Sequence, residues 1–406
     1  MKTFIGFLIT LTVAYSTSRN TCEIYPDPEL GGSRVDCRSL NLPKVPGDLP
    51  SNTVSLDLSD NHIPVLRSQA FIHIPQLLNL KIVGSRVSRL EPHAFETLIN
   101  LRRLNLNYNH LQLDNGTYPQ DIFRPLERLT GLSIGYNNCQ LKGNTPHWIF
   151  KWLINLETLT IDTFEDDIFG SGFGYLKILT TLNIGTGDND ECRYCAIDAI
   201  HNHTFSAFEN STLQVLIASD CHIHHVEAGA FIPLKSISKL VFESVKYLPS
   251  CKALRAFYGL NGKHVCHVLL SSSYSSVTSL SDLKGQLISN GILNKLTDIC
   301  IEHIDLSSNT IIYIDNSFLK VFSKCLKYLD ISKYSLLGNQ LIFFEMKMCK
   351  QLQYIDVSQQ QKYNKHDTET LENLLLIANT HSEKYHRKDV SNLSWNQMVP
   401  SNDYTF

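Results

Sequence analysis

Leucines and other apolar residues recur in the N-terminal half of the chain with a long period that fits neither one amphipathic helix nor one alternating strand. The segment LDLSDN at residues 56–61 returns in outline as LKIVGS at 80–85 and more faithfully as LNLNYN at 104–109. Successive segments end 24 residues apart (85 − 61 and 109 − 85). A period of about 20 to 29 residues with the pattern L-x-x-L-x-L-x-x-N predicts a solenoid, in which each repeat forms one coil that stacks on the next.

Each repeat carries a short L-x-L core that predicts one strand of a parallel sheet. Its leucines point inward, and the residues between them face the concave surface. The predicted fold is an α/β leucine-rich-repeat solenoid of horseshoe shape, with a parallel β-sheet on the concave face and loops and short helices on the convex face. The predicted repeats start at Thr53, Leu77, Leu101, Leu129, Leu156, Leu179, Leu213, Ile237, Val265, Ile301, Leu326 and Leu352.

The ninth place of each repeat is expected to hold an inward amide that hydrogen-bonds the backbone where the strand turns away. It is filled in the early repeats by Asn61, Ser85, Asn109 and Asn137. It then changes to Phe164, Gly187, Cys221 and Val245 and returns to asparagine at Asn309. Phe71, Phe95 and Phe231 each stand 18 residues after a repeat start and are expected to pack beneath the convex loops.

The pattern predicts four segments along the chain. They are a signal peptide at 1–18, an N-terminal cysteine cap at 19–52, about 12 repeats over 53–361, and a degenerate repeat or polar tail at 362–406. The repeat spacing is broken by insertions near 188–210 and 249–300. Insertions in solenoids project as loops and often carry the specific contacts.

The first residues and the sequons indicate export. Lys2 precedes an apolar run from Phe4 to Ala14, which is too short to span a bilayer and predicts a cleaved secretory signal rather than an N-terminal strand. No later stretch offers about 20 uncharged apolar residues, so no membrane span is predicted in this chain. Glycosylation is expected at the N-x-S/T sequons of Asn115, Asn202, Asn210 and Asn392.

Eleven cysteines in an exported chain predict disulfides, with at least one thiol left over because the number is odd. Cys22 and Cys37 flank the segment that must cover the open end of the first coil, and a disulfide between them would hold this cap. Cys192 and Cys195 have zinc-ligand spacing, but an oxidising compartment favours a disulfide within the insertion. Disulfide bonding is also predicted for Cys251 and Cys266.

Two further cysteine patterns leave alternatives open. Cys300, Cys325 and Cys349 recur at the same place of successive repeats, where they fit either disulfides between stacked coils or small buried side chains. Cys221 is followed by three histidines at 222, 224 and 225, which resembles a metal cluster. Its place in the repeat favours an inward cysteine instead, so no metal site is predicted.

Composition narrows the class of function. The chain has 406 residues, of which 43% are hydrophobic and 18% charged, and a formal net charge of −3. It is too apolar for disorder, and it lacks the basic excess that accompanies nucleic-acid binding. No phosphate loop, nucleophile elbow or paired histidine metal motif occurs, so neither enzymatic activity nor a cofactor is predicted.

The clearest candidate ligand-binding residues lie in the last repeats. Asp305, Asp330 and Asp356 share one concave place, and Tyr328 and Tyr354 stand two residues earlier. This acidic and aromatic stripe could receive a basic ligand patch or a cation. The alternative is that Leu-Asp-Leu-Ser is simply a frequent form of the repeat.

The run from Val35 through Cys37 to Asn52, with its V-P-G-D-L-P segment, resembles the N-terminal cap of Toll-like receptors. The following repeats are similar to the ectodomain of that family, over about residues 22–360. The resemblance implies the extracellular ligand-recognition domain of a pattern-recognition receptor in innate immunity. It further implies a microbial or endogenous ligand, and a receptor homodimer or heterodimer on the extracellular side of a membrane.

The chain departs from this family at its end. In Toll-like receptors a C-terminal cysteine cap, a membrane helix and a cytoplasmic signalling domain follow the ectodomain, whereas residues 362–406 are polar and contain no cysteine. The alternative interpretation is therefore a secreted leucine-rich-repeat protein, acting as a decoy, an adhesion protein or a protein-binding scaffold. Either interpretation predicts an extracellular protein.

Overall fold

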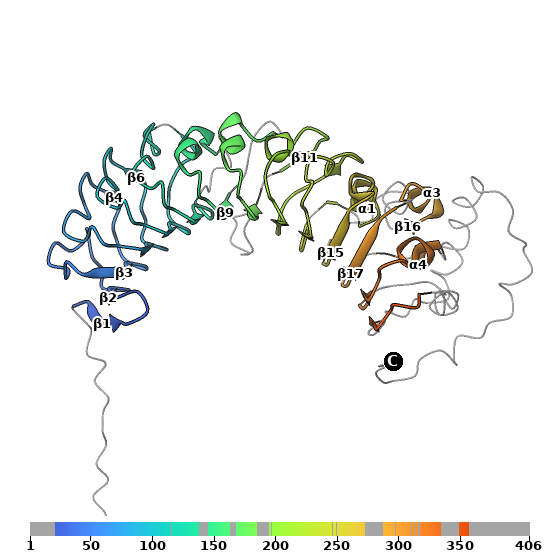
Figure 1. The fold of residues 1–406 in the computed structure, drawn as a ribbon, viewed down its shortest axis with the longest axis horizontal. Helices are drawn as coiled ribbons and strands as arrows, with labels where there is room; N and C mark the ends of the chain where they lie inside the picture. The colour runs from blue at the N-terminus through green and yellow to red at the C-terminus, as the bar shows by residue number, and fades with distance from the viewer. Residues whose placement is uncertain are drawn as a thin grey trace, which may run out of the picture.

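The chain forms a curved solenoid whose inner arc is one long sheet (Figure 1). The computed structural model describes residues 21–114, 116–137, 145–162, 168–184, 195, 197–245, 247–248, 250–272, 287–296, 298–309, 311, 313–315, 317–333 and 349–356; at 250 and 251 it describes the backbone only. Within these residues the sheet has 14 strands in the order β1-β2-β3-β5-β7-β8-β9-β10-β12-β14-β15-β17-β19-β20. The fold is the predicted leucine-rich-repeat solenoid.

Each coil contributes one strand to the concave sheet. The first strand is antiparallel to the second, and every later pair is parallel. The strands are β1 (Glu23–Asp27), β2 (Gly32–Asp36), β3 (Thr53–Asp57), β5 (Asn79–Lys81), β7 (Arg103–Asn105), β8 (Gly131–Ser133), β9 (Thr158–Ile161), β10 (Thr181–Ile184), β12 (Val215–Ala218), β14 (Lys239–Val241), β15 (His264–Leu269), β17 (Cys300–Asp305), β19 (Tyr328–Asp330) and β20 (Tyr354–Asp356).

Short elements form the outer arc of the solenoid (Figure 1). Three pairs of two-residue strands lie there: β4 (Val65–Leu66) with β6 (Arg89–Leu90), β11 (Ala199–Ile200) with β13 (His225–Val226), and β16 (Leu287–Ile288) with β18 (Tyr313–Ile314). The helices are η1 (His147–Trp152), η2 (Ser171–Tyr175), η3 (Ser206–Phe208), α1 (Ser250–Ala256), η4 (Phe257–Leu260), α3 (Asn290–Leu293) and α4 (Ser317–Phe322). In the described part of the chain, no helix is long and apolar enough to cross a membrane.

The core consists of side chains stacked from coil to coil. Leu56, Leu80 and Leu104 are register partners on adjacent strands, and each is no more than 1% exposed. On the convex side the phenylalanines predicted to lie beneath the loops are buried, and the rings of Phe71 and Phe95 stack at 6.1 Å. Because each coil buries its apolar side chains only against its neighbours, the regular period is what creates a continuous core.

Asparagines at the ninth place hold neighbouring coils together through the backbone. The Asn109 Oδ1 atom accepts hydrogen bonds from the backbone N–H groups of Ser85 at 2.9 Å and Val87 at 3.0 Å. Its Nδ2 atom donates to backbone carbonyls, including that of Leu106 at 3.0 Å. Each side chain thus replaces backbone partners that the turning strand loses. In the next coils Asn137 donates its own backbone N–H to the buried carboxylate of Asp162 at 3.1 Å.

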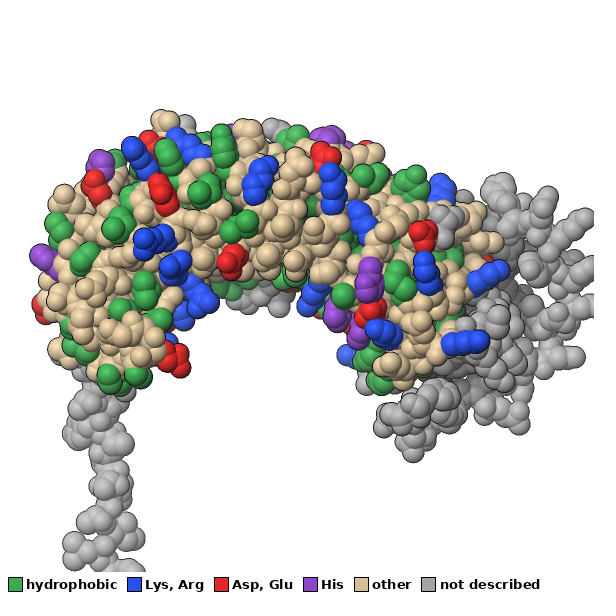
Figure 2. All heavy atoms as spheres, viewed as in Figure 1, with side chains coloured by type: hydrophobic (Ala, Val, Ile, Leu, Met, Phe, Trp, Pro, Cys, Tyr) green, Lys and Arg blue, Asp and Glu red, His purple; other side chains and the backbone are tan. Residues whose placement is uncertain are grey.

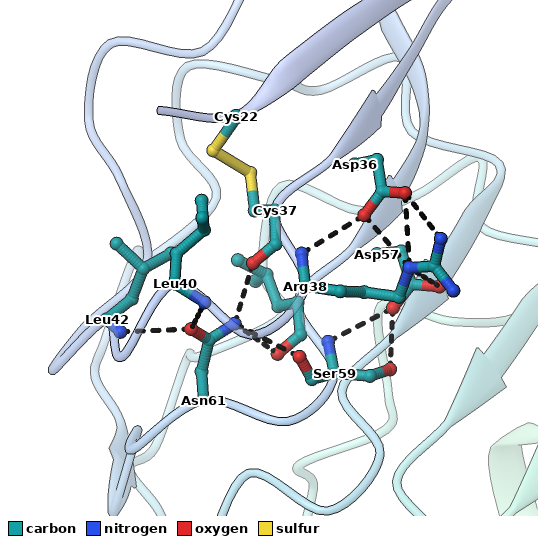
Figure 3. Close-up of a disulfide and its surroundings, with 10 residues drawn as sticks. Cys22, Asp36, Cys37, Arg38, Leu40, Leu42, Asp57, Ser59 and Asn61 are labelled. Atoms are coloured by element: carbon teal, nitrogen blue, oxygen red, sulfur yellow. Dashed lines mark hydrogen bonds and ion pairs between the residues drawn. A yellow bond between two sulfur atoms is a disulfide. The ribbon is translucent and has the colours of Figure 1, made fainter. Parts of the chain in front are cut away.

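The N-terminal cap covers the start of the solenoid, where β1 and β2 begin the sheet (Figure 1), and its disulfide is shown in Figure 3. A disulfide joins Cys22 to Cys37, and Cys37 is fully buried. Asn61 of the first coil binds the cap directly, because its Oδ1 atom accepts the backbone N–H groups of Leu40 at 3.0 Å and Leu42 at 2.9 Å and its Nδ2 atom donates to the Cys37 carbonyl at 2.8 Å. The cap and the first coil are therefore linked both covalently and through the asparagine ladder.

The prediction of a disulfide between Cys192 and Cys195 is wrong. Cys195 is bonded instead to Cys221, 26 residues further along the chain. The same separation of 26 relates Ala199 to its β-sheet partner His225, so Cys195 occupies the ninth place of its own coil. Counting nine residues from the predicted repeat start at Leu179 gives Gly187. The insertion before Cys195 makes this count fail, so that Cys195 is the ninth-place residue. Two ninth-place cysteines on adjacent coils therefore form a covalent link where asparagines form hydrogen bonds elsewhere.

The disulfide predicted at Cys266 is also wrong, because this residue has a free thiol. Cys266 lies in strand β15 of the sheet, whereas Cys251 lies in helix α1. Helix α1 packs against the outer strand β13, so the buried core separates these two backbone positions. Of the evenly spaced cysteines, Cys300 and Cys325 form a disulfide, and the buried Cys349 places its Sγ atom 3.3 Å from the Leu319 carbonyl oxygen.

Removal of the Cys300–Cys325 disulfide is expected to lower the free energy of unfolding by about 2–4 kcal/mol, since this bond restricts the unfolded chain over a separation of 25 residues. The double substitution Cys300→Ser with Cys325→Ser tests this in urea denaturation under non-reducing conditions. Cys266→Ser is the matched control, because it removes a thiol without breaking a bond. Equal stability of the two variants would contradict a stabilising disulfide.

Candidate functional site

The C-terminal half of the concave sheet presents two columns of side chains that change character along the solenoid. The ring column, which is defined by strand register, is Lys239, His267, His303, Tyr328 and Tyr354. The concave strip beside it is Ile217, Val241, Leu269, Asp305, Asp330 and Asp356. On each strand from β14 to β20, the residue between its two column members is buried and points into the core, because side chains alternate along a strand.

Four aromatic or imidazole rings of the ring column stack on successive strands. Ring centroids are 4.5 Å apart for His267 and His303, 5.6 Å for His303 and Tyr328, and 4.3 Å for Tyr328 and Tyr354. The two tyrosine rings are inclined by only 12°. Because each ring covers the face of its neighbour, the column presents mainly ring edges and polar tips to a ligand. Such packing restricts side-chain motion before binding.

The three aspartates of the concave strip bring like charges together. Asp305 pairs in register with Asp330, and Asp330 with Asp356. Partial burial, reinforced by the two flanking carboxylates, raises the pKa of Asp330. Burial also raises the pKa of Glu243 on the adjacent turn, and the negative charge of Asp305 raises it further. This end of the concave face therefore favours a cation.

The other half of the concave strip is apolar. Val241 is 5% exposed, and Ile217 and Leu269 beside it are partly exposed. Lys239 borders this half in the ring column. Burial, together with the charges of His303 and Lys239, lowers the pKa of His267 and so favours its uncharged imidazole. Apolar and acidic surfaces thus adjoin on one continuous sheet face.

All five predicted ligand-binding residues lie on this face, and the structure adds neighbours that the sequence interpretation missed. The predicted residues Asp305, Tyr328, Asp330, Tyr354 and Asp356 are partly exposed and contiguous. The missed residues are His267, His303 and the three apolar members of the strip. Alignment of the strands by their buried residues would have found His303, which holds the same place before Ile304 as Tyr328 holds before Leu329.

Replacement of Asp330 by asparagine is expected to raise the melting temperature near neutral pH. A raised pKa means that the folded state disfavours the ionised carboxylate, so this residue costs stability above its ordinary pKa of 3.8 and the cost disappears as pH falls below that value. Asparagine keeps the Oδ1 atom that accepts the Ser332 N–H at 2.8 Å. Thermal unfolding at several pH values should show a gain that vanishes in acid. Asp298→Asn, which removes an exposed carboxylate paired with Lys324, is the control; a lower melting temperature for Asp330→Asn would contradict this account.

The described sequons lie away from the concave face. Asn202 and Asn210 are exposed and flank helix η3, which follows strand β11 in the chain. Asn115 and Asn392 lie outside the described residues, as does Cys192. On the face shown in Figure 2, basic and acidic side chains are interspersed with apolar ones. Among the described residues, no group of three or more potential ligands could hold a metal ion.

The chain is a leucine-rich-repeat protein. A family model described as "Leucine rich repeat" matches residues 51–111. Leucine-rich repeat-containing protein 3 of Danio rerio is 36% identical over 107 residues, covering 26% of this chain and 39% of that protein. Trophoblast glycoprotein of Macaca fascicularis is 33% identical over 108 residues, covering 26% of each. Podocan of Mus musculus is 26% identical over 147 residues, covering 32% of this chain and 24% of podocan.

The matched segments span less than half of the length of each of these relatives. Among solved structures, human 5T4 (trophoblast glycoprotein) aligns with a TM-score of 0.43 and 20% identity over 60% of this chain and 86% of that chain. The matched proteins are non-enzymatic leucine-rich-repeat proteins, in agreement with the prediction that the chain is not an enzyme. The disulfides and the likeness to a trophoblast glycoprotein indicate an extracellular location.

Proposed function

We propose that this protein is an extracellular protein-binding solenoid that engages a protein partner through the C-terminal half of its concave sheet. The observation that carries the proposal is the continuity of the concave strip with the stacked ring column. This surface supplies apolar area, rigid rings and the carboxylates of Asp305 and Asp330 on a preformed face. Protein interfaces draw their affinity from such anchors rather than from area alone.

The positions of the described sequons support binding of the partner at the concave face. Asn202 and Asn210 are exposed and lie outside the strands of the concave sheet, so glycans attached to them would leave that sheet accessible. The concave strip also lies on strands, which hold side chains more rigidly than loops do.

A glycan placed on the concave sheet is expected to abolish partner binding. Lys239→Asn with Val241→Thr creates a sequon on strand β14, and the attached glycan would cover the concave strip. Binding of the secreted variant to an array of purified extracellular domains would be compared with binding of the unaltered protein. The control, Ser236→Asn, creates a sequon with Ser238 at an exposed site before the strand. Equal binding by both glycosylated variants would contradict the proposal.

A second candidate function is ligand recognition as the ectodomain of a Toll-like receptor. The feature that favours it is the cap sequence from Val35 to Asn52, with its disulfide between Cys22 and Cys37. The relatives reported above, which are leucine-rich-repeat proteins of other kinds, favour the secreted scaffold. Expression of the native transcript separates the two, because membrane retention of the product supports the receptor and release into the medium supports the scaffold.

A further inference from the structure

We infer that the concave strip binds an extended segment of the partner protein in which an apolar side chain is followed by arginine or lysine side chains. This inference rests on the protein-binding function proposed above and specifies the chemistry of the partner. It follows from three features of the strip: the charge left on Asp305 and Asp330, the covered ring faces beside them, and the apolar residues that continue the same column.

Asp305 and Asp330 have charge available for an external cation. In the described residues, Asp305 and Asp330 accept backbone N–H groups, from Ser307 and Ser332 at 2.8 Å each, but they take part in no salt bridge. Glu302, on the same strand as Asp305, is different, because it is already paired with Lys327 at 3.0 Å and His264 at 2.9 Å. A ligand cation between Asp305 and Asp330 would offset the repulsion that these carboxylates impose on each other.

The ring column directs a cation toward the carboxylates. Tyr328 and Tyr354 cover each other's faces at 4.3 Å, so a cation cannot insert between them and stack on both. The Tyr354 hydroxyl donates a hydrogen bond to the Asp356 carboxylate at 3.4 Å. Arginine or lysine donors that reach Asp356 would therefore also meet the Tyr354 oxygen, which can accept a hydrogen bond. A planar guanidinium with several donors suits this arrangement particularly well.

The remainder of the strip sets the direction of the segment. Ile217 on β12 and Leu269 on β15 are partly exposed and flank the largely buried Val241 on β14, so they offer an apolar surface to a ligand. Lys239 borders that surface and would repel a cation placed there. The apolar side chain of the ligand is therefore expected over β14, with its basic side chains over β17, β19 and β20.

The length of the strip fits a short peptide. Six strands carry it, from β12 to β20, and five steps of about 4.8 Å between strands span roughly 24 Å. An extended chain advances about 3.3–3.6 Å per residue, so about seven residues cover this distance. The segment is thus short enough to be supplied by one loop or one terminus of a partner.

The test measures binding of a labelled peptide, LIGRSRSR, to the secreted protein by fluorescence anisotropy at physiological ionic strength. The triple variant Asp305→Asn, Asp330→Asn, Asp356→Asn is expected to weaken binding about tenfold or more. The matched control neutralises three exposed carboxylates outside the concave sheet, in Glu96→Gln, Glu209→Gln, Asp298→Asn, and should change affinity less than about twofold. Melting curves establish that both triple variants are folded.

Two peptides complete the design. The charge-reversed LIGESESE should not bind, and the order-reversed RSRSRGIL should bind more weakly than LIGRSRSR. Equal loss of affinity in both triple variants, or equal binding of all three peptides, would overturn the inference. If the glycan at 239 removes partner binding while the aspartate triple variant retains it, the basic segment is wrong and the protein-binding function stands. If the glycan has no effect, the proposed function itself fails.

Discussion

Substitution of Asn109 by leucine is expected to lower the free energy of unfolding by about 3–6 kcal/mol. The leucine is close in size but cannot accept hydrogen bonds from the backbone N–H groups of Ser85 and Val87, which bind Asn109 at 2.9 and 3.0 Å. These groups lie in the buried turn between two coils, and each unsatisfied group costs about 1–3 kcal/mol. The carbonyls that receive the amide protons lose a partner as well.

Urea denaturation of the secreted variant measures this effect. Asn100→Leu is the matched control, because the same chemical change there removes only an exposed hydrogen bond from the Arg128 guanidinium. That control should lose no more than about 1 kcal/mol. The asparagine ladder would not be a major source of stability if Asn109→Leu proved no more harmful than Asn100→Leu.

Loss of the cap disulfide is expected to have the second large effect. Cys22→Ser with Cys37→Ser removes a bond that closes a separation of 15 residues, which contributes about 3 kcal/mol by restricting the unfolded chain. It also loosens the strands β1 and β2 that cover the first coil, where Leu56 is 1% exposed. We expect a total loss of about 3–5 kcal/mol and markedly lower secretion, measured as yield in the medium and as melting temperature.

Arg38→Ala provides the contrasting variant within the same cap. Arg38 pairs with Asp36 at 2.7 Å, but its side chain is 57% exposed, so this solvent-screened ion pair should contribute little to stability. Unchanged secretion of the double cysteine variant, or a larger effect of Arg38→Ala, would show that the disulfide does not hold the cap in place.

Much of the architecture was predictable because it depends on local periodicity. The predicted repeat starts each stand at or close to a strand of the concave sheet, including the irregular one at Val265, which lies within β15. Asn109 and Phe95 take the inward positions expected of them. A residue's place in the repeat decides its direction in the coil, so these assignments needed no knowledge of distant contacts.

The cysteine pairings show where prediction from a residue's place in the repeat fails. Cys195 pairs with Cys221 rather than with Cys192, because the insertion before it shifts the ninth place of its coil. Cys266 has no disulfide partner although Cys251 is near in sequence, since the intervening helix and the core put them on different sides of the solenoid. Bond formation depends on distance in space, and an insertion of variable length changes that distance without changing the local pattern.

Part of the candidate site could also be predicted from the sequence, and part could not. The aspartates and tyrosines of the last repeats could be assigned to the concave face from their place beside buried residues. That His267 and His303 continue the tyrosine stack, and that Leu269 lies beside Asp305, depends on how β15 pairs with β17 across a long irregular connection. The sequence by itself determined the solenoid, its coil period and the direction of most side chains, because these arise within one repeat. Only the tertiary structure decided which coils are neighbours across the insertions, and hence which cysteines bond and which rings and carboxylates form one surface, because strand register and distance arise between repeats.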